Sequence, residues 1–289
     1  MSPHRLGLLL VAGSSVAYST AGFFTRLIVL DSWTMLFWRG VFAGCFIAGI
    51  VVAREREGAW RALRRTGLPG LAAAGCSALA TILFINAFRR TSVADVVVIF
   101  ATAPFVTAVL GRVWLGVREG WVTMLASLVE LVGVVIMVGG AFREGRLEGN
   151  LLAFGMTLLM SVMMLLIRRH RDTPMLPAAG LSAFLCALAV LPVASPLAVG
   201  GREFVYLALF GVTQFGMGLL LLTTGGALIS AGQAALINTM ETPLAVFWVW
   251  LAFGEVPAAA SLVGGAIVMA AVVGHVWHSA AAVPADGSG

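Results

Sequence analysis

Residues 6–24 read LGLLLVAGSSVAYSTAGFF and contain no charged side chain. A helix needs about 20 consecutive apolar residues to cross a bilayer, so this stretch predicts a membrane-spanning helix. A signal peptide is the alternative, but no clear cleavage site precedes a polar mature domain. Of the 289 residues, 60% are hydrophobic and 11% are charged, against roughly a quarter charged in soluble domains. We therefore expect an all-α, polytopic membrane protein.

Breaks rich in Arg, Gly and Pro divide the chain into ten apolar segments. The gap near Gly225–Ser230 is the least marked, because it carries no charge. The small, polar residues 280–289 are expected to form a disordered tail. The ten predicted spans are residues 6–26, 34–53, 68–88, 93–115, 121–141, 150–168, 177–197, 203–224, 230–252 and 258–278.

The distribution of arginine predicts the orientation, because cytoplasmic loops of membrane proteins carry an excess of basic residues. If the N-terminus is inside, ten arginines fall in cytoplasmic breaks and six in outer breaks. Both termini are therefore expected in the cytoplasm, in an inner (plasma) membrane protein. No basic face with interleaved aromatics lies outside the spans, so we expect no nucleic-acid partner. The inner set is Arg5, Arg54, Arg56, Arg61, Arg64, Arg65, Arg118, Arg168, Arg169 and Arg171, and the outer set is Arg26, Arg89, Arg90, Arg143, Arg146 and Arg202.

The two halves of the chain share short patterns in the same order. An odd number of spans in each half forces the halves into opposite orientations, an arrangement typical of secondary transporters. We predict a first five-helix repeat over residues 1–145 and a second over residues 146–279. The matches are Leu9-Leu10-x-x-Gly13 with Leu151-Leu152-x-x-Gly155, Trp114-Leu115 and Glu119 with Trp250-Leu251 and Glu255, and residues 126–129 with 260–263.

Two longer stretches carry a family resemblance. Thr91-Ser92 through Pro104 to Glu119, and Ser230 through Glu241-Thr242-Pro243 to Glu255, resemble the paired signature of the drug/metabolite transporter superfamily, EamA type. In that family each half closes with a Pro-containing helix, an apolar run, a glycine and an acid. Phe253-Gly254-Glu255 fits this pattern, whereas two residues separate Gly116 from Glu119.

Within that superfamily, residues 16–23 and 84–88 resemble YddG-type exporters of aromatic amino acids. The resemblance implies ten helices, both termini in the cytoplasm, and a central cavity lined by helices 1, 3, 4, 6, 8 and 9. It also implies that the fifth and tenth helices lie at the periphery.

Pro104 and Pro243 are candidate hinges. A proline in mid-helix removes a backbone hydrogen bond and kinks the helix, and the freed carbonyl must face protein or water; a static kink is the alternative. Glu241 lies next to Pro243, where a carboxylate is costly unless it serves a cavity, a partner or a proton. Asn238, one turn earlier, is expected on the same face.

Arg39, preceded by Trp38, is the main cation predicted inside a span. Its guanidinium is suited to a substrate carboxylate, or it pairs with Glu241 or Glu130, or reaches toward headgroups. Glu130 is expected to be peripheral, with an interhelical partner. Glu119 and Glu255 precede predicted spans and suit helix N-termini. Gly40-x-x-x-Gly44 permits close helix contact.

Aromatic and hydrogen-bonding side chains on the predicted cavity helices suit an amphipathic planar solute, although ordinary helix packing explains any single one. The methionines of residues 156–164 add a soft surface. The predicted substrate-binding residues are Tyr18, Ser19, Phe23, Trp38, Arg39, Phe84, Asn86, Phe100, Gln214, Phe215, Asn238 and Glu241.

Enzyme chemistry finds no support, since the sequence has no HExxH, GxSxG or phosphate-binding GxxxxGK[ST] motif. Cys45, Cys76 and Cys186 lack metal or disulfide spacing, and His275-x-x-His278 fits a solvated helix end. We expect no cofactor and no metal. The expected partners are the lipid bilayer and a small-molecule substrate, and a monomer is one possible oligomeric state. The predicted function is export of small amphipathic metabolites, aromatic amino acids first, by alternating access; the alternatives are another cargo such as a drug-like compound, a passive channel, or an intramembrane enzyme.

Overall fold

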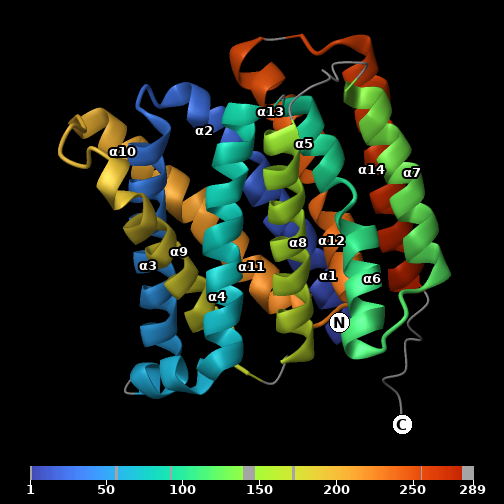
Figure 1. The fold of residues 1–289 in the computed structure, drawn as a ribbon, viewed down its shortest axis with the longest axis horizontal. Helices are drawn as coiled ribbons and strands as arrows, with labels where there is room; N and C mark the ends of the chain where they lie inside the picture. Colours follow the sequence, from blue (N-terminus) through green and yellow to red (C-terminus); the bar gives the residue numbers. More distant parts are fainter. Residues whose placement is uncertain are drawn as a thin grey trace.

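The computed structural model describes residues 2–55, 58–91, 93–138, 147–170, 173–254 and 256–281, and these are helical without a strand. The helices stand side by side as one bundle (Figure 1). They are α1 (Pro3–Ser19), α2 (Ala21–Leu27), α3 (Ser32–Glu55), α4 (Ala59–Arg90), α5 (Val93–Phe100), α6 (Ala103–Leu115), α7 (Trp121–Val138), α8 (Leu147–Arg169), α9 (Leu176–Val190), η2 (Leu191–Val193), α10 (Gly201–Leu209), η3 (Phe210–Gly216), α11 (Met217–Gly226), α12 (Ala231–Asn238), α13 (Glu241–Phe253) and α14 (Ala259–Ala281).

Nine helical stretches of the described chain are long and apolar enough to cross a membrane, and α7 adds a shorter apolar helix, Trp121–Met137. Each predicted segment overlaps one of these stretches, although residues 139–141 of the fifth segment lie outside the described residues. The uncharged gap after segment eight is present, because α11 ends at Gly226 and α12 begins at Ala231. α14 continues to Ala281, so the predicted tail begins two residues early; its remainder lies outside the described residues.

Several spans are interrupted rather than continuous. α5 ends at Phe100 and α6 begins at Ala103, while α12 ends at Asn238 and α13 begins at Glu241. Pro104 lies in the first turn of α6, where its missing N–H leaves no intrahelical bond unmade; Pro243 is the third residue of α13, also in the first turn. Each proline therefore follows a two-residue turn between the two helical segments of one span, so the predicted kink takes the form of a short interruption.

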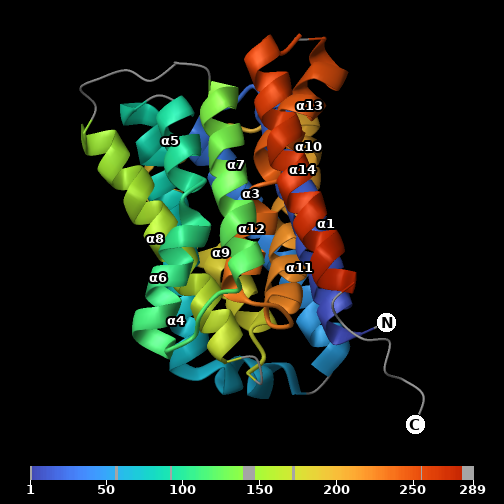
Figure 2. The same ribbon diagram turned by 90° about the vertical axis from the view of Figure 1, so that its right-hand side faces the viewer.

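Glycines set the closest helix contacts. A Cβ on Gly40 would lie 2.6 Å from the carbonyl oxygen of Ala183, so α3 and α9 touch through backbone, as the Gly40 pattern predicts. Gly133 of α7 and Gly264 of α14 approach each other in the same way. α7 and α14 lie side by side along one flank of the bundle (Figures 1 and 2). This agrees with the peripheral place expected for the fifth and tenth helices.

The helices of the two halves pack across one another. α1 packs against α11, α12 and α13, and α8 packs against α4, α5 and α6. α3 pairs with α9 and α7 pairs with α14. The start of α1 and the end of α14 lie at the same end of the bundle (Figure 2).

The N-terminal part of α4 turns away from the bundle axis. Gly67 has φ +54°, a left-handed conformation that side chains disfavour, and it breaks the helix there. The residues before it run across the end of the bundle (Figure 1). Trp60 is exposed on this segment, beside Arg64.

Candidate substrate site

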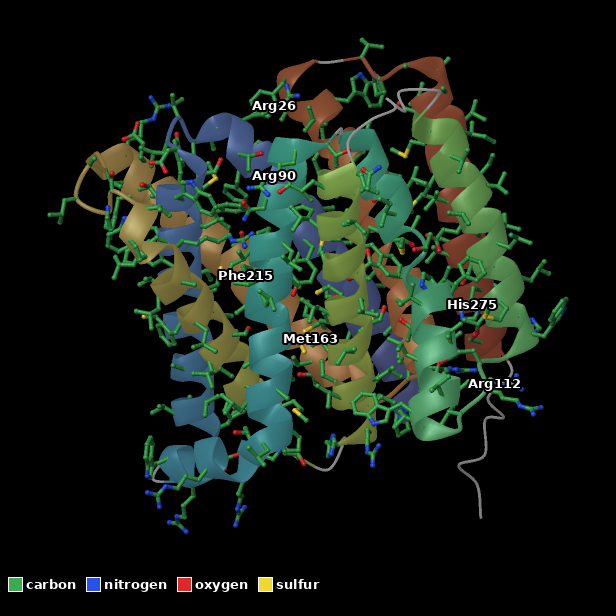
Figure 3. All side chains as sticks on the ribbon, in the orientation of Figure 1. Arg26, Arg90, Arg112, Met163, Phe215 and His275 are labelled. Atoms are coloured by element: carbon green, nitrogen blue, oxygen red, sulfur yellow. The ribbon has the colours of Figure 1, made fainter. Side chains whose placement is uncertain are left out.

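Arg39 of α3 is held between aromatic rings in the interior of the bundle. Its Cζ lies 4.3 Å from the ring centroid of Phe215 and 5.6 Å from that of Phe210. The Nε atom is buried and has no hydrogen-bond partner. Phe215 lies at mid-height, between Arg26 and Arg90 at one end of the bundle and Arg112 at the other (Figure 3). A guanidinium in this position has donors to offer to an anion.

Both rings come from η3, a π-helix inside the span formed by α10, η3 and α11. Such π segments are often found at functional sites. Gly211 and Gly216 bring η3 against α3: a Cβ on Gly211 would lie 2.9 Å from the carbonyl oxygen of Arg39. Gln214 donates from Nε2 to the carbonyl oxygen of Tyr18 at 3.3 Å, and its buried Oε1 has no partner. η3 thus presents rings and one amide beside Arg39.

Glu241, on the second broken helix, lies within the electrostatic field of Arg39. It is the first residue of α13, where the helix dipole favours a negative charge. Arg39 is the one charged side chain in the described structure whose field acts on Glu241, yet no ion pair within 4.0 Å and no hydrogen bond joins them. Tyr18 lies within the field of both groups. The interior therefore holds a cation and a carboxylate that are near each other and not directly paired.

Serines of the first helix in each half bind the breaks of the other half. Ser15 of α1 donates to the carbonyl oxygen of Ile237, just before the α12–α13 break, at 3.0 Å. Ser161 of α8 lies 3.5 Å from the carbonyl oxygen of Ala103, at the α5–α6 break. Each contact joins the first helix of one half to the backbone beside the interrupted span of the other half. The two breaks are thus held in corresponding ways.

The family model for the EamA-like transporter family matches residues 5–139 and again residues 147–277. The chain belongs to this family. One solved crystal structure, described only as a protein, has a TM-score of 0.81 to the chain at 16% identity, over 95% of this chain and 98% of its own. That likeness concerns the fold alone. The comparison with curated proteins gives no match.

Three further residues predicted for the substrate site of this EamA-like transporter differ in their contacts. The Trp248 indole of α13 donates to Ser19 Oγ at 2.9 Å. Asn238 ends α12 with a buried Oδ1 that has no partner. Asn238 and Glu241 stand on either side of the α12–α13 break. Phe23 of α2 packs against Phe24 and Phe253, at the edge of this region.

Four other predicted residues make contacts that do not involve Arg39. The Trp38 indole donates to the carbonyl oxygen of Pro196 and packs on Phe204, so it points toward the α9–α10 connection. Asn86 of α4 donates to the carbonyl oxygen of Ile82 in its own helix. Phe84 is 36% exposed, and Phe100 packs against the main apolar core. Sequence reasoning did not single out Phe210, which lies beside Arg39, or Trp248, which donates to Ser19.

Glu119 has a structural place different from the one expected. Its Oε2 accepts from Ser230 Oγ at 2.6 Å, and its Oε1 accepts from the Gly232 N–H at 3.0 Å. It therefore caps the N-terminus of α12 rather than that of α7, the next helix in the sequence. Glu255, its predicted counterpart, lies outside the described residues.

A small hollow lies among apolar side chains. It lies between α4, α8, α9 and α11, and its cavity volume is only about 10 Å³. Ser77, Ser182 and Thr223 are its polar wall positions, and Met163 faces it.

The predicted absence of a metal site concerns His275 in particular. His275 contacts Ser279 at 3.2 Å, and the described residues contain no cluster that could hold a metal ion.

Proposed function

We propose that this EamA-like membrane transporter is a secondary transporter that exports small amphipathic metabolites, amino acids including aromatic ones, by alternating access. The observation that carries the proposal is the unpaired placement of Arg39 and Glu241 beside the rings of Phe210, Phe215 and Tyr18. Two opposite charges inside a membrane are costly unless they serve a ligand or each other.

An amino acid is complementary to this arrangement. Its carboxylate matches the guanidinium of Arg39, and its ammonium matches the carboxylate of Glu241. An aromatic side chain would find ring partners in Phe215 and Tyr18, with the unpartnered Gln214 Oε1 as an additional acceptor. The cargo is thus held by charges at one end and by rings at the other.

The wider architecture proposed is ten helices in two inverted five-helix repeats, 1–145 and 146–279, with both termini in the cytoplasm of an inner membrane. The twofold match of the family model and the exchange of contacts between the halves support this arrangement. So does the common end at which α1 begins and α14 ends. The prolines Pro104 and Pro243 then stand at the two places where the halves would bend.

Transport by purified protein in liposomes tests the function. Labelled Phe, Trp, Leu and Lys are supplied, and uptake is measured with unlabelled amino acid inside the vesicles. We expect saturable, exchange-stimulated flux of Phe and Trp over Lys. Flux that is linear in concentration would instead indicate a channel, and absence of flux for all four would refute the amino-acid cargo.

Arg39→Gln and Glu241→Gln are the matched variants, because each removes one charge at nearly constant volume. Both are expected to lower Phe flux at least tenfold. Arg112→Gln is the control, since Arg112 lies near one end of the bundle (Figure 3). Equal loss in the control would remove the assignment of Arg39.

A further inference from the structure

Glu130 is a carboxyl group sealed inside the protein with no charged partner among the described residues. It lies on α7, its side chain is 0% exposed, and neither Oε1 nor Oε2 has a hydrogen-bond partner. A buried carboxylate is normally paired with a cation or bonded to several donors. Glu130 has neither, and the substrate site around Arg39 makes no use of it.

The surroundings of Glu130 contain no described cation. The elements packed against α7 are α5, α6, α12 and α14. The Thr239 hydroxyl is the polar group beside Glu130, but it donates its proton to the carbonyl oxygen of Leu236 at 2.6 Å. Among the charged groups of those helices, Arg112 is toward one end of the bundle (Figure 3), His275 contacts Ser279, His278 is in the last turn of α14, and the side chain of Asp95 is outside those described. On α13, Glu241 lies within the field of Arg39.

This environment suits a neutral carboxylic acid. Burial without a counter-charge disfavours the ionised form. The Thr239 oxygen, with its own proton already donated, is free to accept one from a protonated Glu130. Glu130 therefore carries a bound proton in this conformation.

The position of Glu130 links that proton to both broken helices. Thr239 stands in the α12–α13 break, two residues before Glu241. One turn along α7, Val134 packs against Ala101, which stands in the α5–α6 break. A movement at either break changes the wall that seals Glu130 from water.

We propose that Glu130 is the proton-carrying residue that couples transport to a proton gradient; this rests on the function proposed above. On the acidic side a proton passes from water to the Glu130 carboxylate, and on the other side the carboxylic acid returns it to water. One proton moves in one direction as one cargo molecule moves in the other. In this scheme Glu241 binds the cargo, and Glu130 binds and releases the transported proton.

The experiment compares two assays on the same proteoliposomes. Exchange of labelled for unlabelled Phe at equal pH measures transport alone. Accumulation of labelled Phe in vesicles whose lumen is about one pH unit more acidic measures coupling, because an antiporter concentrates cargo on the acidic side whichever way it is inserted. The wild type is expected to accumulate Phe up to about tenfold, the limit for one proton per cargo molecule.

Glu130→Gln mimics the protonated acid and cannot release a proton. We expect it to exchange Phe at equal pH and to lose accumulation, with a ratio of about one. Ser127→Ala is the control, because Ser127 is equally buried on the same helix; it should keep both activities. Accumulation by Glu130→Gln, or an absence of gradient-driven accumulation in a wild type that exchanges, would overturn the inference.

Infrared spectroscopy provides a readout that does not depend on cargo. The wild type at neutral pH should show the C=O stretching band of a protonated carboxyl group, and Glu130→Gln should lack that band while Glu241→Gln keeps it. If Glu130→Gln fails to fold, Glu130→Asp should shift the band. If the wild type shows this band but no exchange of Phe, the proposed cargo is refuted and the assignment of a proton to Glu130 is not. If the wild type lacks the band, that assignment is refuted.

Discussion

The guanidinium of Arg39 lies over the ring of Phe215, with 4.3 Å between Cζ and the ring centroid. A desolvated contact of a cation with an aromatic face is worth about 2 kcal/mol. Phe215→Leu keeps the apolar volume and removes the ring, so Arg39 loses a support that orients it. We expect the KM for Phe to rise on the order of tenfold. Saturation kinetics in liposomes measure it, with the exposed Phe154→Leu as control; equal KM values in the two variants would contradict this role.

The cap that Glu119 places on α12 gives a stability prediction. Glu119→Ala removes both acceptors, which leaves the Gly232 N–H without its partner. Hydrogen bonds to charged groups contribute about 1.5–3 kcal/mol, so the Tm in detergent should fall by roughly 5 °C. Tryptophan fluorescence during heating measures the change. Glu55→Ala, at the exposed end of α3, should leave the Tm within about 1 °C.

The contact of α7 with α14 leaves no room for a side chain at Gly264. A Cβ there would lie 2.6 Å from Met137 Cα and still closer to the carbonyl oxygen of Gly133. Backbone atoms cannot yield as a flexible side chain can, so Gly264→Ala must separate the helices and should destabilise the protein by about 1–3 kcal/mol or more. Gly274→Ala, on the same helix with nothing within 4 Å, should not lower the Tm. Similar Tm values for both variants would refute the close packing.

Asp31 predicts a dependence of stability on pH. Its Oδ1 accepts from the N–H groups of Trp33 and Thr34 at 3.0 and 2.9 Å and so caps α3. Partial burial alone would raise the pKa of Asp31, but the hydrogen bonds from Thr34 and Trp33 outweigh it and bring the pKa below its usual 3.8. The cap therefore stabilises the fold above pH 3.8 and is lost as the pH falls through the lower pKa of the folded state.

Thermal unfolding between about pH 3 and pH 6 tests the Asp31 cap. Asp31→Ala should cost about 1 kcal/mol at neutral pH, and its deficit relative to the wild type should shrink toward acid pH. Asp31→Asn keeps a capping oxygen without a titrating proton, so the difference in Tm between Asp31→Asn and Asp31→Ala should not change with pH. A deficit for Asp31→Ala that stays constant with pH would refute the role of the charge.

The positions of the spans follow from the sequence because the bilayer imposes a length of about 20 apolar residues. The runs ending at Arg26, Arg90 and Arg168 were located for that reason. The form of the breaks was not predictable, because the presence of a proline does not show whether it kinks a helix or stands in the first turn of a new one. Pro104 and Pro243 do the second.

The sequence predicted the charged residues of the site but only part of the arrangement of the side chains around them. Arg39 and Glu241 stood out because ionised groups are rare within spans. The rings around Arg39 come from η3, and nothing in the hydropathy of residues 210–216 distinguishes a π-helix from an α-helix. The contact of Glu119 with Ser230 joins residues far apart in the chain, so it depends on the tertiary fold and not on any local pattern.

η3 also changes which residues share a helical face along the eighth span. A π turn holds more residues than an α turn of similar rise, and each extra residue rotates the later part of the span by about 100° relative to a continuous α-helix. A single helical wheel from Gly201 to Gly226 therefore assigns the wrong faces beyond Gly216. Two wheels are needed, one ending at Leu209 and one beginning at Met217, and only the second places Gly218 and Gly225 correctly against α1.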